Sequence, residues 1–464
     1  MNLSSLLTDH PAGAGDTLVS ELDRSFTKGE VVDRVDALAE QLLGASGPGK
    51  PIAIVAEGTE MLLGMFAAWR NGQVFVPINP RQPQAVIDEV LERTGASMIV
   101  DSTGVRPHHT DTLHDPGVAF VLWTSGTSGR PKAVLHTHDA YLEIIDRVLG
   151  PLRTGARDPA KPPSPNLIPV SMALNAGIYN ALFGLRAGAP LVLMNGFDTQ
   201  TFATLVHRHA IRSTVLPPAA MAMLSDDTSI ESLAPLRYLR SITAPLSPFQ
   251  ARRFTDRFGV TVLNGYGQAE IGEVIGWTAA DAKAHPDKIG AIGKPHPGVD
   301  IRLDDPDQNN VGELLVRPPN TAAGYADGDD LTDRLSDDGF VHTGDLARID
   351  GEGFVWIEGR QGDLINRGGN KVFPDEVEEV LAAVPGVREA AVVGAPDDRL
   401  GQIPVAFVVT VADPSDAPDD EALAAACRAS LVAYKVPVRF ERIDALPRNE
   451  AGKLLRRSLL ETKR

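Results

Sequence analysis

Two spacings of hydrophobic residues alternate in the N-terminal part of the chain. Residues 26–44 carry apolar side chains three and four positions apart, which predicts an amphipathic helix. Short apolar runs at 51–56, 72–77 and 96–100 predict buried strands, and helical patterns at 60–69 and 85–93 separate them. Strands that alternate with helices indicate a parallel sheet with crossover helices, and therefore an α/β fold.

The same kind of pattern continues toward the C-terminus. Apolar runs at 118–123, 260–263, 312–317 and 390–394 predict strands, and residues 176–185 and 374–383 predict helices. Residues 151–165 contain five prolines, which predicts an irregular loop. The segment 260–263 is expected to end where Asn264 begins a glycine-containing motif, and ligands of parallel α/β sheets bind at such strand ends.

The run 118–123 leads into a stretch rich in glycine, hydroxyl and basic residues: Thr124, Ser125, Gly126, Thr127, Ser128, Gly129, Arg130, Pro131 and Lys132. Glycines allow a tight turn whose backbone N–H groups point inward, and the hydroxyls and cations add donors and positive charge. Such a loop can cradle a polyphosphate. It is not the ordinary P-loop, which requires Gly-Lys-Ser/Thr, and a plain surface turn is the alternative interpretation.

Composition limits the class of protein. The 464 residues are enough for two or more domains, and a net charge of −17 argues against general nucleic-acid binding. The single cysteine, Cys427, excludes a disulfide framework and fits a reducing cytoplasm. The first residues have no basic start followed by an apolar run, so no signal peptide is expected. No apolar stretch reaches the roughly 18 residues that a membrane helix needs.

The order of residues 124–132 resembles the signature loop of the adenylate-forming superfamily, which contains acyl-CoA synthetases, carrier-protein adenylation domains and luciferases. Further stretches resemble the motifs of this superfamily and occur in the same order, so that the resemblance covers nearly the whole chain. They are residues 241–246 (SITAPL), 264–270 (NGYGQAE), 343–345 (TGD), 366–378 (NRGGNKVFPDEVE) and 447–453 (PRNEAGK).

The resemblance implies a fold and a division into domains. A large α/β domain, residues 1–360, would contain parallel or mixed sheets with helices and a small subdomain, and would bind ATP and the acid. A small mobile α+β domain, residues 361–464, would follow, with a hinge near Gly362. The superfamily normally has Asp or Lys at the hinge, but glycine also absorbs backbone rotation readily.

The resemblance also implies nucleotide-binding roles. Glu270 would bind Mg²⁺, for which a carboxylate oxygen is a suitable ligand. Tyr266 would stack on adenine, Asp345 would accept hydrogen bonds from the ribose hydroxyls, and Arg360 would lie near ribose and phosphate. Lys453 would reach the acyl carboxylate and the α-phosphate, so that Lys453, Glu270 and Thr124 form the catalytic set. The remaining predicted cofactor-binding residues are Ser125, Gly126, Thr127, Ser128, Gly129, Lys132, Ala244, Pro245, Asn264, Gly265, Gly267, and Gly368 and Gly369, which would line a pantetheine tunnel.

The acid would be held, by the same resemblance, by Met172, Asn175, Ile242, Thr243 and Ala269. Residues 169–177 lack the aspartate that amino-acid-activating domains use, and a buried ammonium without a carboxylate is costly, so an α-amino acid substrate is not expected. Ile242 and Thr243 replace small residues, which predicts a narrowed acyl pocket. Ala269 replaces a threonine, and losing one charge-assisted contact would cost about 1.5–3 kcal/mol.

The implied reaction has two steps: a carboxylate attacks the α-phosphate of MgATP, and a nucleophile then displaces AMP from the acyl-AMP. Residues 366–378 are of the CoA-ligase type and favour coenzyme A as the acceptor. An acyl carrier protein, an amine or another nucleophile is the alternative acceptor. A nucleotide-binding protein with little catalysis is a third possibility, and retention of Lys453, Glu270, Asp345 and Arg360 argues against it. The sequence does not indicate the oligomeric state.

Overall fold

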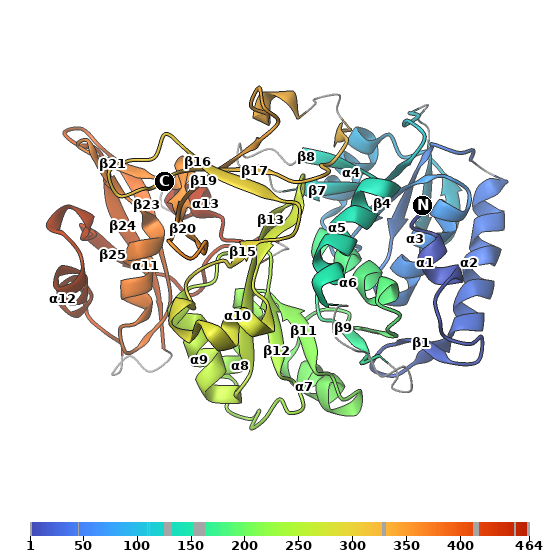
Figure 1. Ribbon diagram of the computed structural model, residues 1–464, viewed down its shortest axis with the longest axis horizontal. Coiled ribbons are helices and arrows are strands. Elements are labelled where there is room, and N and C mark those ends of the chain that lie inside the picture. The colour runs from blue at the N-terminus through green and yellow to red at the C-terminus, as the bar shows by residue number, and fades with distance from the viewer. Residues whose placement is uncertain are drawn as a thin grey trace.

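The computed structural model describes residues 2–44, 46–108, 110, 112–124, 132–152, 163–326, 331–411, 417–449 and 452–461. The chain forms a large N-terminal body and a smaller C-terminal body, whose buried clusters begin at Ile365 and which is orange to red at the left of Figure 1. The predicted glycine-rich residues Ser125, Gly126, Thr127, Ser128 and Gly129 lie outside the described residues, as does the side chain of Thr124.

Two large sheets organise the N-terminal body. The seven-stranded sheet has the order β18 (Gly324–Tyr325), β8 (Lys132–Thr137), β7 (Val118–Thr124), β4 (Val74–Ile78), β3 (Pro51–Val55), β5 (Met98–Asp101), β6 (Gly104–Pro107). The nine-stranded sheet has the order β15 (Lys294–Pro295), β14 (Gly272–Gly276), β13 (Thr261–Gln268), β12 (Tyr238–Ser241), β11 (Ser213–Leu216), β9 (Asn166–Ile168), β10 (Leu191–Leu193), β1 (Thr17–Ser20), β2 (Ser25–Thr27). Both sheets mix parallel and antiparallel pairs.

Helices pack on both faces of these sheets because the central strands are apolar on both sides. In β3, Ile52 and Ile54 join one buried cluster and Ala53 joins another, as the twofold alternation of a strand requires. The first cluster also holds side chains of α1 (Ser5–Thr8), α2 (Lys28–Leu43), α3 (Gly58–Arg70), α5 (His138–Leu152) and α6 (Asn175–Arg186). The second is covered by α4 (Gln84–Thr94). On the nine-stranded sheet, α7 (Thr199–Arg208), α8 (Pro218–Asp226) and α9 (Pro248–Phe258) share a further cluster.

A small antiparallel sheet follows in the chain. Its order is β16 (Asp300–Asp304), β17 (Gly312–Arg317), β19 (Val341–Ile349), β20 (Val355–Arg360). Its buried side chains pack against Ile271, Val274 and Ile275, which lie in or just before β14. This contact fixes β19 and β20 against the end of β13. The short helix α10 (Ala279–Ala284) and the 3₁₀ helices η1 (Pro286–Lys288) and η2 (Thr332–Arg334) occupy the connections.

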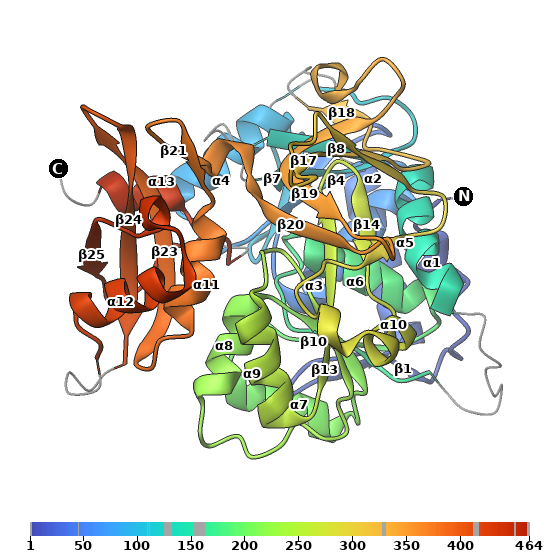
Figure 2. The same cartoon turned by 60° about the vertical axis from the view of Figure 1, so that its left-hand side comes forward.

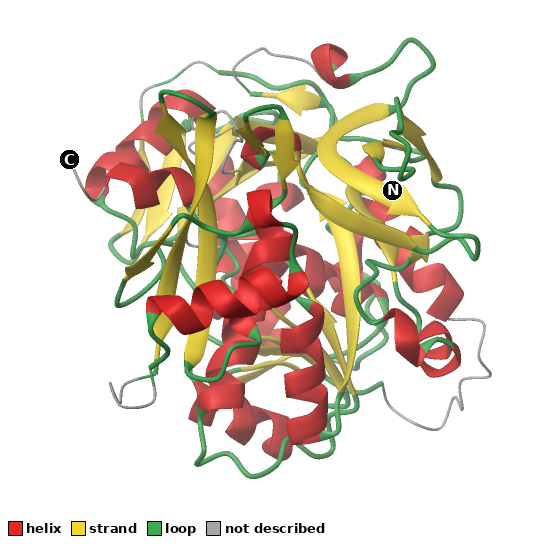
Figure 3. Ribbon diagram, turned by 90° about the vertical axis from the view of Figure 1, so that its left-hand side faces the viewer, coloured by secondary structure: helices red, strands yellow, loops and turns green. Residues whose placement is uncertain are grey.

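The C-terminal body is an α+β unit. Its strands are β21 (Ile365–Arg367), β22 (Asn370–Val372), β23 (Val387–Asp397), β24 (Gly401–Thr410) and β25 (Arg439–Arg442). One face packs on α11 (Pro374–Ala382) and α12 (Asp420–Ser430), which bury Cys427, and the other packs on α13 (Arg456–Glu461). Figure 3, which faces this body, shows its long strands running beside the helices.

The buried clusters separate along the chain. Clusters of the N-terminal body extend no further than Ile357, and those of the C-terminal body begin at Ile365. The connection between the two bodies contains the 3₁₀ helix η3 (Gln361–Asp363). Another 3₁₀ helix, η4 (Ala433–Lys435), lies within the C-terminal body. The two bodies are in contact, since α11 of the C-terminal body packs against α9 and β20 of the N-terminal body (Figure 2). The boundary at residue 360 and the hinge at Gly362 stay predictions.

The predicted α/β fold with a second α+β unit is confirmed. One prediction of detail was wrong: the strand expected at 260–263 continues as β13 to Gln268, so the motif at 264–268 lies within a strand. The reason is that β14 folds back and pairs with Gly265 through Gln268. The proline-rich loop expected at 151–165 is helical at its first two residues, and residues 153–162 lie outside the described part.

Candidate active site

Strand β13 supplies the centre of the site. Its first half pairs in parallel with β12, and its second half pairs antiparallel with β14, whose apolar residues pack against the small antiparallel sheet. At Gly267 a Cβ atom would lie 2.1 Å from the carbonyl oxygen of Gly272, so only glycine fits there. The turn after β13 carries Ala269 and Glu270.

Asp345 is the most heavily hydrogen-bonded acid of the site. It lies on β19 opposite Arg360 of β20 and is 5% exposed. Arg360 Nε donates to Asp345 Oδ1 at 2.6 Å, Tyr266 Oη donates to Oδ2 at 2.5 Å, and Gln268 Nε2 donates to Oδ2 at 3.1 Å. Burial and the charge of Asp345 raise the pKa of the Tyr266 hydroxyl well above its ordinary value, so this group stays a proton donor.

Glu270 is a second carboxylate of the same site. It is 7% exposed, and its Oε1 atom accepts hydrogen bonds from Tyr325 Oη at 2.9 Å and from Arg334 Nη1 at 2.8 Å. The Lys132 ammonium lies 4.4 Å from the centre of the Tyr325 ring, a cation–π contact. The structure therefore brings Lys132, at the end of the predicted phosphate loop, close to the predicted metal-binding carboxylate.

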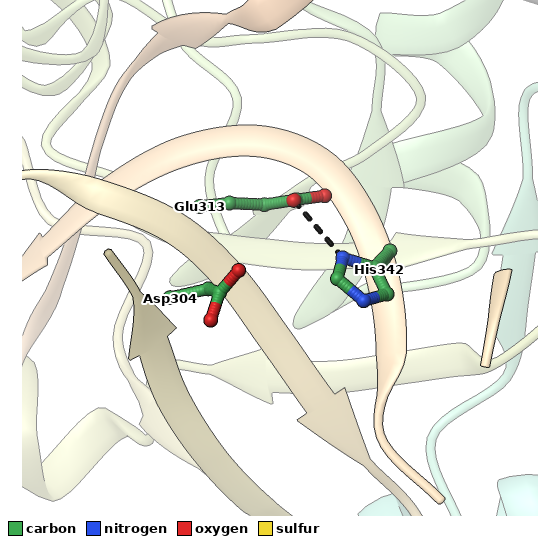
Figure 4. Close-up of side chains that lie close together, drawn as sticks. All are labelled: Asp304, Glu313 and His342. Carbon is green, nitrogen blue, oxygen red and sulfur yellow. Dashed lines mark hydrogen bonds and ion pairs between the residues drawn. The ribbon is translucent and has the colours of Figure 1, made fainter. Parts of the chain in front are cut away.

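A glutamate on the neighbouring strand β17 holds the backbone of β19 just before Asp345. Glu313 Oε1 accepts from the Gly344 amide at 2.9 Å, and Glu313 Oε2 lies 3.0 Å from His342 Nδ1. Figure 4 shows this pair with Asp304 beside it. The ligand atoms of the three side chains lie within 4.8 Å of one another, but these hydrogen bonds account for Glu313 and His342 without a metal ion.

A partly buried ion pair supports β13 from the other side. Glu273 pairs with Arg240 and, at 3.0 Å, with His296 Nε2. A Cβ atom at Gly265 would lie 3.3 Å from Glu273 Oε1, so the predicted nucleotide-binding glycine makes room for this pair. Asn264, also predicted to bind the nucleotide, is buried, and its side-chain oxygen accepts from the Gly265 amide at 3.1 Å.

The C-terminal body contributes a loop to the site. A Cβ atom at Gly452 would lie 3.9 Å from Pro217, the residue before α8. The Lys453 amide donates to Asn449 Oδ1 at 2.8 Å, which holds the loop. Burial, and next the positive charge of Arg360, lower the pKa of the Lys453 ammonium. Lys453 therefore lies within electrostatic reach of Arg360 and Asp345, although it is distant in sequence.

The predicted acid-binding residues fall into two groups. Asn175 begins α6 and its Oδ1 accepts from Tyr141 Oη at 2.6 Å, while Met172 is 3% exposed and belongs to the core cluster that includes Tyr141. Ala269 packs against Tyr325 and the cluster around it. The structure thus buries Met172 in the core between the large sheets.

The second group follows β12. Thr243 has φ of +71°, a left-handed conformation that a β-branched residue rarely adopts and that costs on the order of 1–3 kcal/mol. Thr243 and Pro245 are exposed, and Ile242 and Ala244 are partly buried. A glycine would avoid this strain, so Thr243, one of the two enlarged positions noted in the sequence, lies at a strained position.

Gly368 and Gly369 form the two-residue turn between β21 and β22. Their φ values are +60° and +92°, and the Gly368 amide donates to the Leu400 carbonyl at 2.8 Å. Positive φ at both positions is what a tight hairpin of this kind requires. Gly362 lies in η3 and is exposed, and a Cβ atom there would meet nothing within 4 Å.

Three residues of the site were not predicted: Gln268, Tyr325 and Arg334. Gln268 stood inside a recognised motif, at a position that carried no role. Tyr325 and Arg334 lie in a segment without a motif, and the sequence contains no signal that would pair them with Glu270.

In the described part of the chain, no helix has the length and apolar character needed to cross a membrane.

Comparisons with known proteins place the chain in a family. A model of the AMP-binding enzyme family matches residues 9–117 and 101–326, and a model of the AMP-binding enzyme C-terminal domain matches residues 376–453. A feruloyl-CoA synthase of an Amycolatopsis species is 30% identical over 477 residues, covering 95% of this chain and 94% of the relative. A sulfoacetate–CoA ligase of Cupriavidus necator is 34% identical over 353 residues, covering 74% of this chain and 66% of the relative.

Solved structures agree in fold. ATP-bound MatB from Rhodopseudomonas palustris superimposes with a TM-score of 0.87 at 24% identity, covering 100% of this chain and 99% of that one. The amide bond synthetase McbA from Marinactinospora thermotolerans gives a TM-score of 0.84 at 26% identity, with coverages of 100% and 99%. The chain belongs to the AMP-binding enzyme family, and it is an AMP-forming acid–CoA ligase that adenylates a carboxylic acid with ATP and transfers the acyl group to coenzyme A.

Proposed function

We propose that the two carboxylates beside β13 divide the binding of MgATP between them, with Asp345 on the ribose and Glu270 on the metal. The observation that carries this proposal is that Arg360 pairs with Asp345, and that hydrogen bonds through Gln268 and Arg334 link Asp345 to Glu270. Lys453 of the C-terminal body interacts electrostatically with Arg360 and Asp345. Catalysis in such a site consists of positioning the reactants and neutralising charge.

The hydrogen bonds of Asp345 leave room for a ribose hydroxyl. Oδ2 accepts from both Tyr266 and Gln268, whereas among the described residues Oδ1 accepts from Arg360 alone. A carboxylate oxygen can accept about two hydrogen bonds, so Oδ1 retains one acceptor position. In this proposal a ribose hydroxyl takes that position, the Tyr266 ring lies against adenine, and Ala244, Pro245, Asn264, Gly265 and Gly267 supply the surrounding wall.

Glu270 fits a magnesium ion. Tyr325 and Arg334 both donate their hydrogen bonds to the Oε1 atom of Glu270. No hydrogen bond from the described part of the chain reaches its Oε2 atom. A single carboxylate together with substrate phosphates is a usual set of ligands for Mg²⁺, and the bound ion would neutralise the developing pyrophosphate charge. Lys132 would assist through its position over Tyr325, together with residues 124–129.

Lys453 is the proposed catalytic cation of the first step. It would bind the acyl carboxylate and the α-phosphate together and so bring the two reacting groups into line. Rotation of residues 361–464 about Gly362 would then remove Lys453 and present the hairpin at Gly368 and Gly369 to the acyl-AMP, a hinge motion of a common kind. Coenzyme A would approach along that hairpin, and we propose that the reaction takes place in the cytoplasm.

The acid is proposed to be one without an α-amino group and of limited width. Residues 169–177 contain no carboxylate, and Ile242 and Thr243 enlarge a segment in which the superfamily has small residues. An acyl carrier protein or an amine is the alternative acceptor, and the likeness to an amide bond synthetase is the observation that favours an amine.

The first prediction concerns the products. ATP, Mg²⁺ and a panel of short, medium and aryl acids should give acyl-CoA when coenzyme A is present and acyl-AMP when it is absent, as read by mass spectrometry. α-Amino acids should give neither product. Acyl-AMP that accumulates and ignores coenzyme A, but reacts with an added amine or a pantetheinylated carrier protein, would contradict the proposed acceptor.

The second prediction separates the two steps. Lys453→Ala should abolish formation of acyl-AMP from acid and ATP, because no cation then bridges the reactants, but should leave thioester formation from supplied acyl-AMP close to the wild-type rate. Single-turnover assays of each step measure this difference. Lys283→Ala, at an exposed position on α10, is the control and should change neither step. Equal loss of both steps would count against the assignment.

The third prediction concerns the ribose site. Tyr266→Phe removes one donor from the buried Asp345 carboxylate, and a hydrogen bond to a charged group contributes about 1.5–3 kcal/mol. The KM for ATP should therefore rise by about tenfold or more. Tyr238→Phe, at an exposed tyrosine, is the matched control. An unchanged KM for ATP would show that the Tyr266 hydroxyl does not support nucleotide binding.

The fourth prediction concerns the acid. Ile242→Gly should raise kcat/KM for longer or wider acids relative to short ones, because it removes a bulky side chain from the proposed acyl pocket. The Ile242→Ala variant should give an intermediate profile. The measurement is a comparison of kcat/KM over a series of acids of increasing chain length. A profile identical to that of the wild type would contradict the narrowed pocket.

A further inference from the structure

Arg334 joins three separate parts of the active site. It is the last residue of η2, in the connection between β18 and β19. Its Nη1 donates to Glu270 Oε1 at 2.8 Å, and its Nη2 donates to Gln268 Oε1 at 2.5 Å. Nε and Nη2 also donate to the His342 carbonyl, at 3.2 and 2.9 Å. A guanidinium group has the planar set of donors that such a bridge requires, and an ammonium group does not.

Gln268 extends the bridge to the ribose side. Its Oε1 faces Arg334, while its Nε2 donates to Asp345 Oδ2 at 3.1 Å and to the Thr343 carbonyl at 2.9 Å. The orientation of this amide follows from its neighbours, because the opposite one would place NH₂ against guanidinium donors and oxygen against acceptor oxygens. A continuous set of hydrogen bonds therefore runs from Glu270 through Arg334 and Gln268 to Asp345.

The charges along this path balance. Each buried carboxylate has one guanidinium partner, Arg334 for Glu270 and Arg360 for Asp345. Without Arg334, the described residues would leave Glu270 with the Tyr325 hydroxyl alone, and a buried charge without a charged partner is costly. Glu270 would then turn to solvent or rotate, and Oε2 would no longer have a fixed direction.

We propose that Arg334 is a positioning residue that fixes Glu270 for the metal ion and couples the metal side of the site to the ribose side through Gln268. In this arrangement Arg334 and Tyr325 hold Glu270 by hydrogen bonds to its Oε1 atom, and its Oε2 atom faces the cation. Because Gln268 is held by Arg334 at one end and holds Asp345 at the other, ordering of one side favours ordering of the other. The inference rests on the proposed roles of Glu270 and Asp345.

The fifth prediction tests both sides by binding rather than by turnover. Arg334→Gln should weaken Mn²⁺ binding to the complex with a non-hydrolysable ATP analogue by about tenfold or more, measured by electron paramagnetic resonance, because a charge-assisted bond is lost. It should also weaken AMP binding without metal about threefold to tenfold, measured by calorimetry, since Gln268 loses its anchor. Arg302→Gln, at an exposed arginine paired with Asp338, is the control and should change neither affinity.

Two further variants separate positioning from a general effect on folding. Arg334→Lys should recover much of the Mn²⁺ affinity but not the AMP affinity, because an ammonium can pair with Glu270 but cannot also hold Gln268. Gln268→Met should weaken AMP binding in the wild-type background and have little further effect in Arg334→Gln. Thermal unfolding of each variant identifies any that is misfolded. If Arg334→Gln does not fold, the Mn²⁺ and AMP affinities of Arg334→Lys test the inference in its place.

The possible outcomes are distinct. Wild-type affinities in Arg334→Gln, additive effects of the two substitutions, or tighter Mn²⁺ binding in Arg334→Gln would overturn the inference, the last because Arg334 would then compete with the cation. If the wild-type protein itself binds neither AMP nor the Mn²⁺–nucleotide complex, the proposed function fails instead.

Discussion

The active site depends on the burial of one charged group, the Asp345 carboxylate. A carboxylate that is 5% exposed is stable only when hydrogen bonds replace its water, and here Arg360, Tyr266 and Gln268 do so. These donors come from β20 and β13, so satisfying Asp345 also fixes the small antiparallel sheet against the large one. Glu270 is linked to the same junction through Gln268 and Arg334.

Backbone packing makes that junction possible. Within the nine-stranded sheet, β13 pairs with β14 so closely that Gly267 cannot carry a side chain. The apolar residues in and just before β14 pack against the small sheet, and the partly buried Arg240–Glu273 pair supports the strand from the other side. The strand therefore has little freedom, which suits residues that must hold a nucleotide in one orientation. The loop with Lys453, by contrast, belongs to a body with its own core and reaches the site across a contact between the two bodies.

Much of this was predictable from local patterns. The helices and central strands of the first hundred or so residues follow their apolar spacing. The motifs ending in Glu270, Asp345 and Lys453 were recognised in order, and the same resemblance pointed to Arg360. The length of β13 was not predictable, because its continuation through Gly-Tyr-Gly has no hydrophobic run and depends on pairing with β14. Arg334 was missed for a similar reason: a single arginine in a polar connection has no local property that reveals its partner.

By itself the sequence determined the fold class, the family and the candidate residues of the nucleotide site, because hydrophobic period, glycine placement and motif order are local properties of the chain. Only the tertiary structure decided which charges meet. Glu270 lies 64 residues from Arg334 in sequence, and Asp345 lies 79 residues from Tyr266, so these pairs exist because strands from distant segments pack together. Burial then strengthens the pairs, since a partner is worth far more to a charge that has lost its water than to one on the surface.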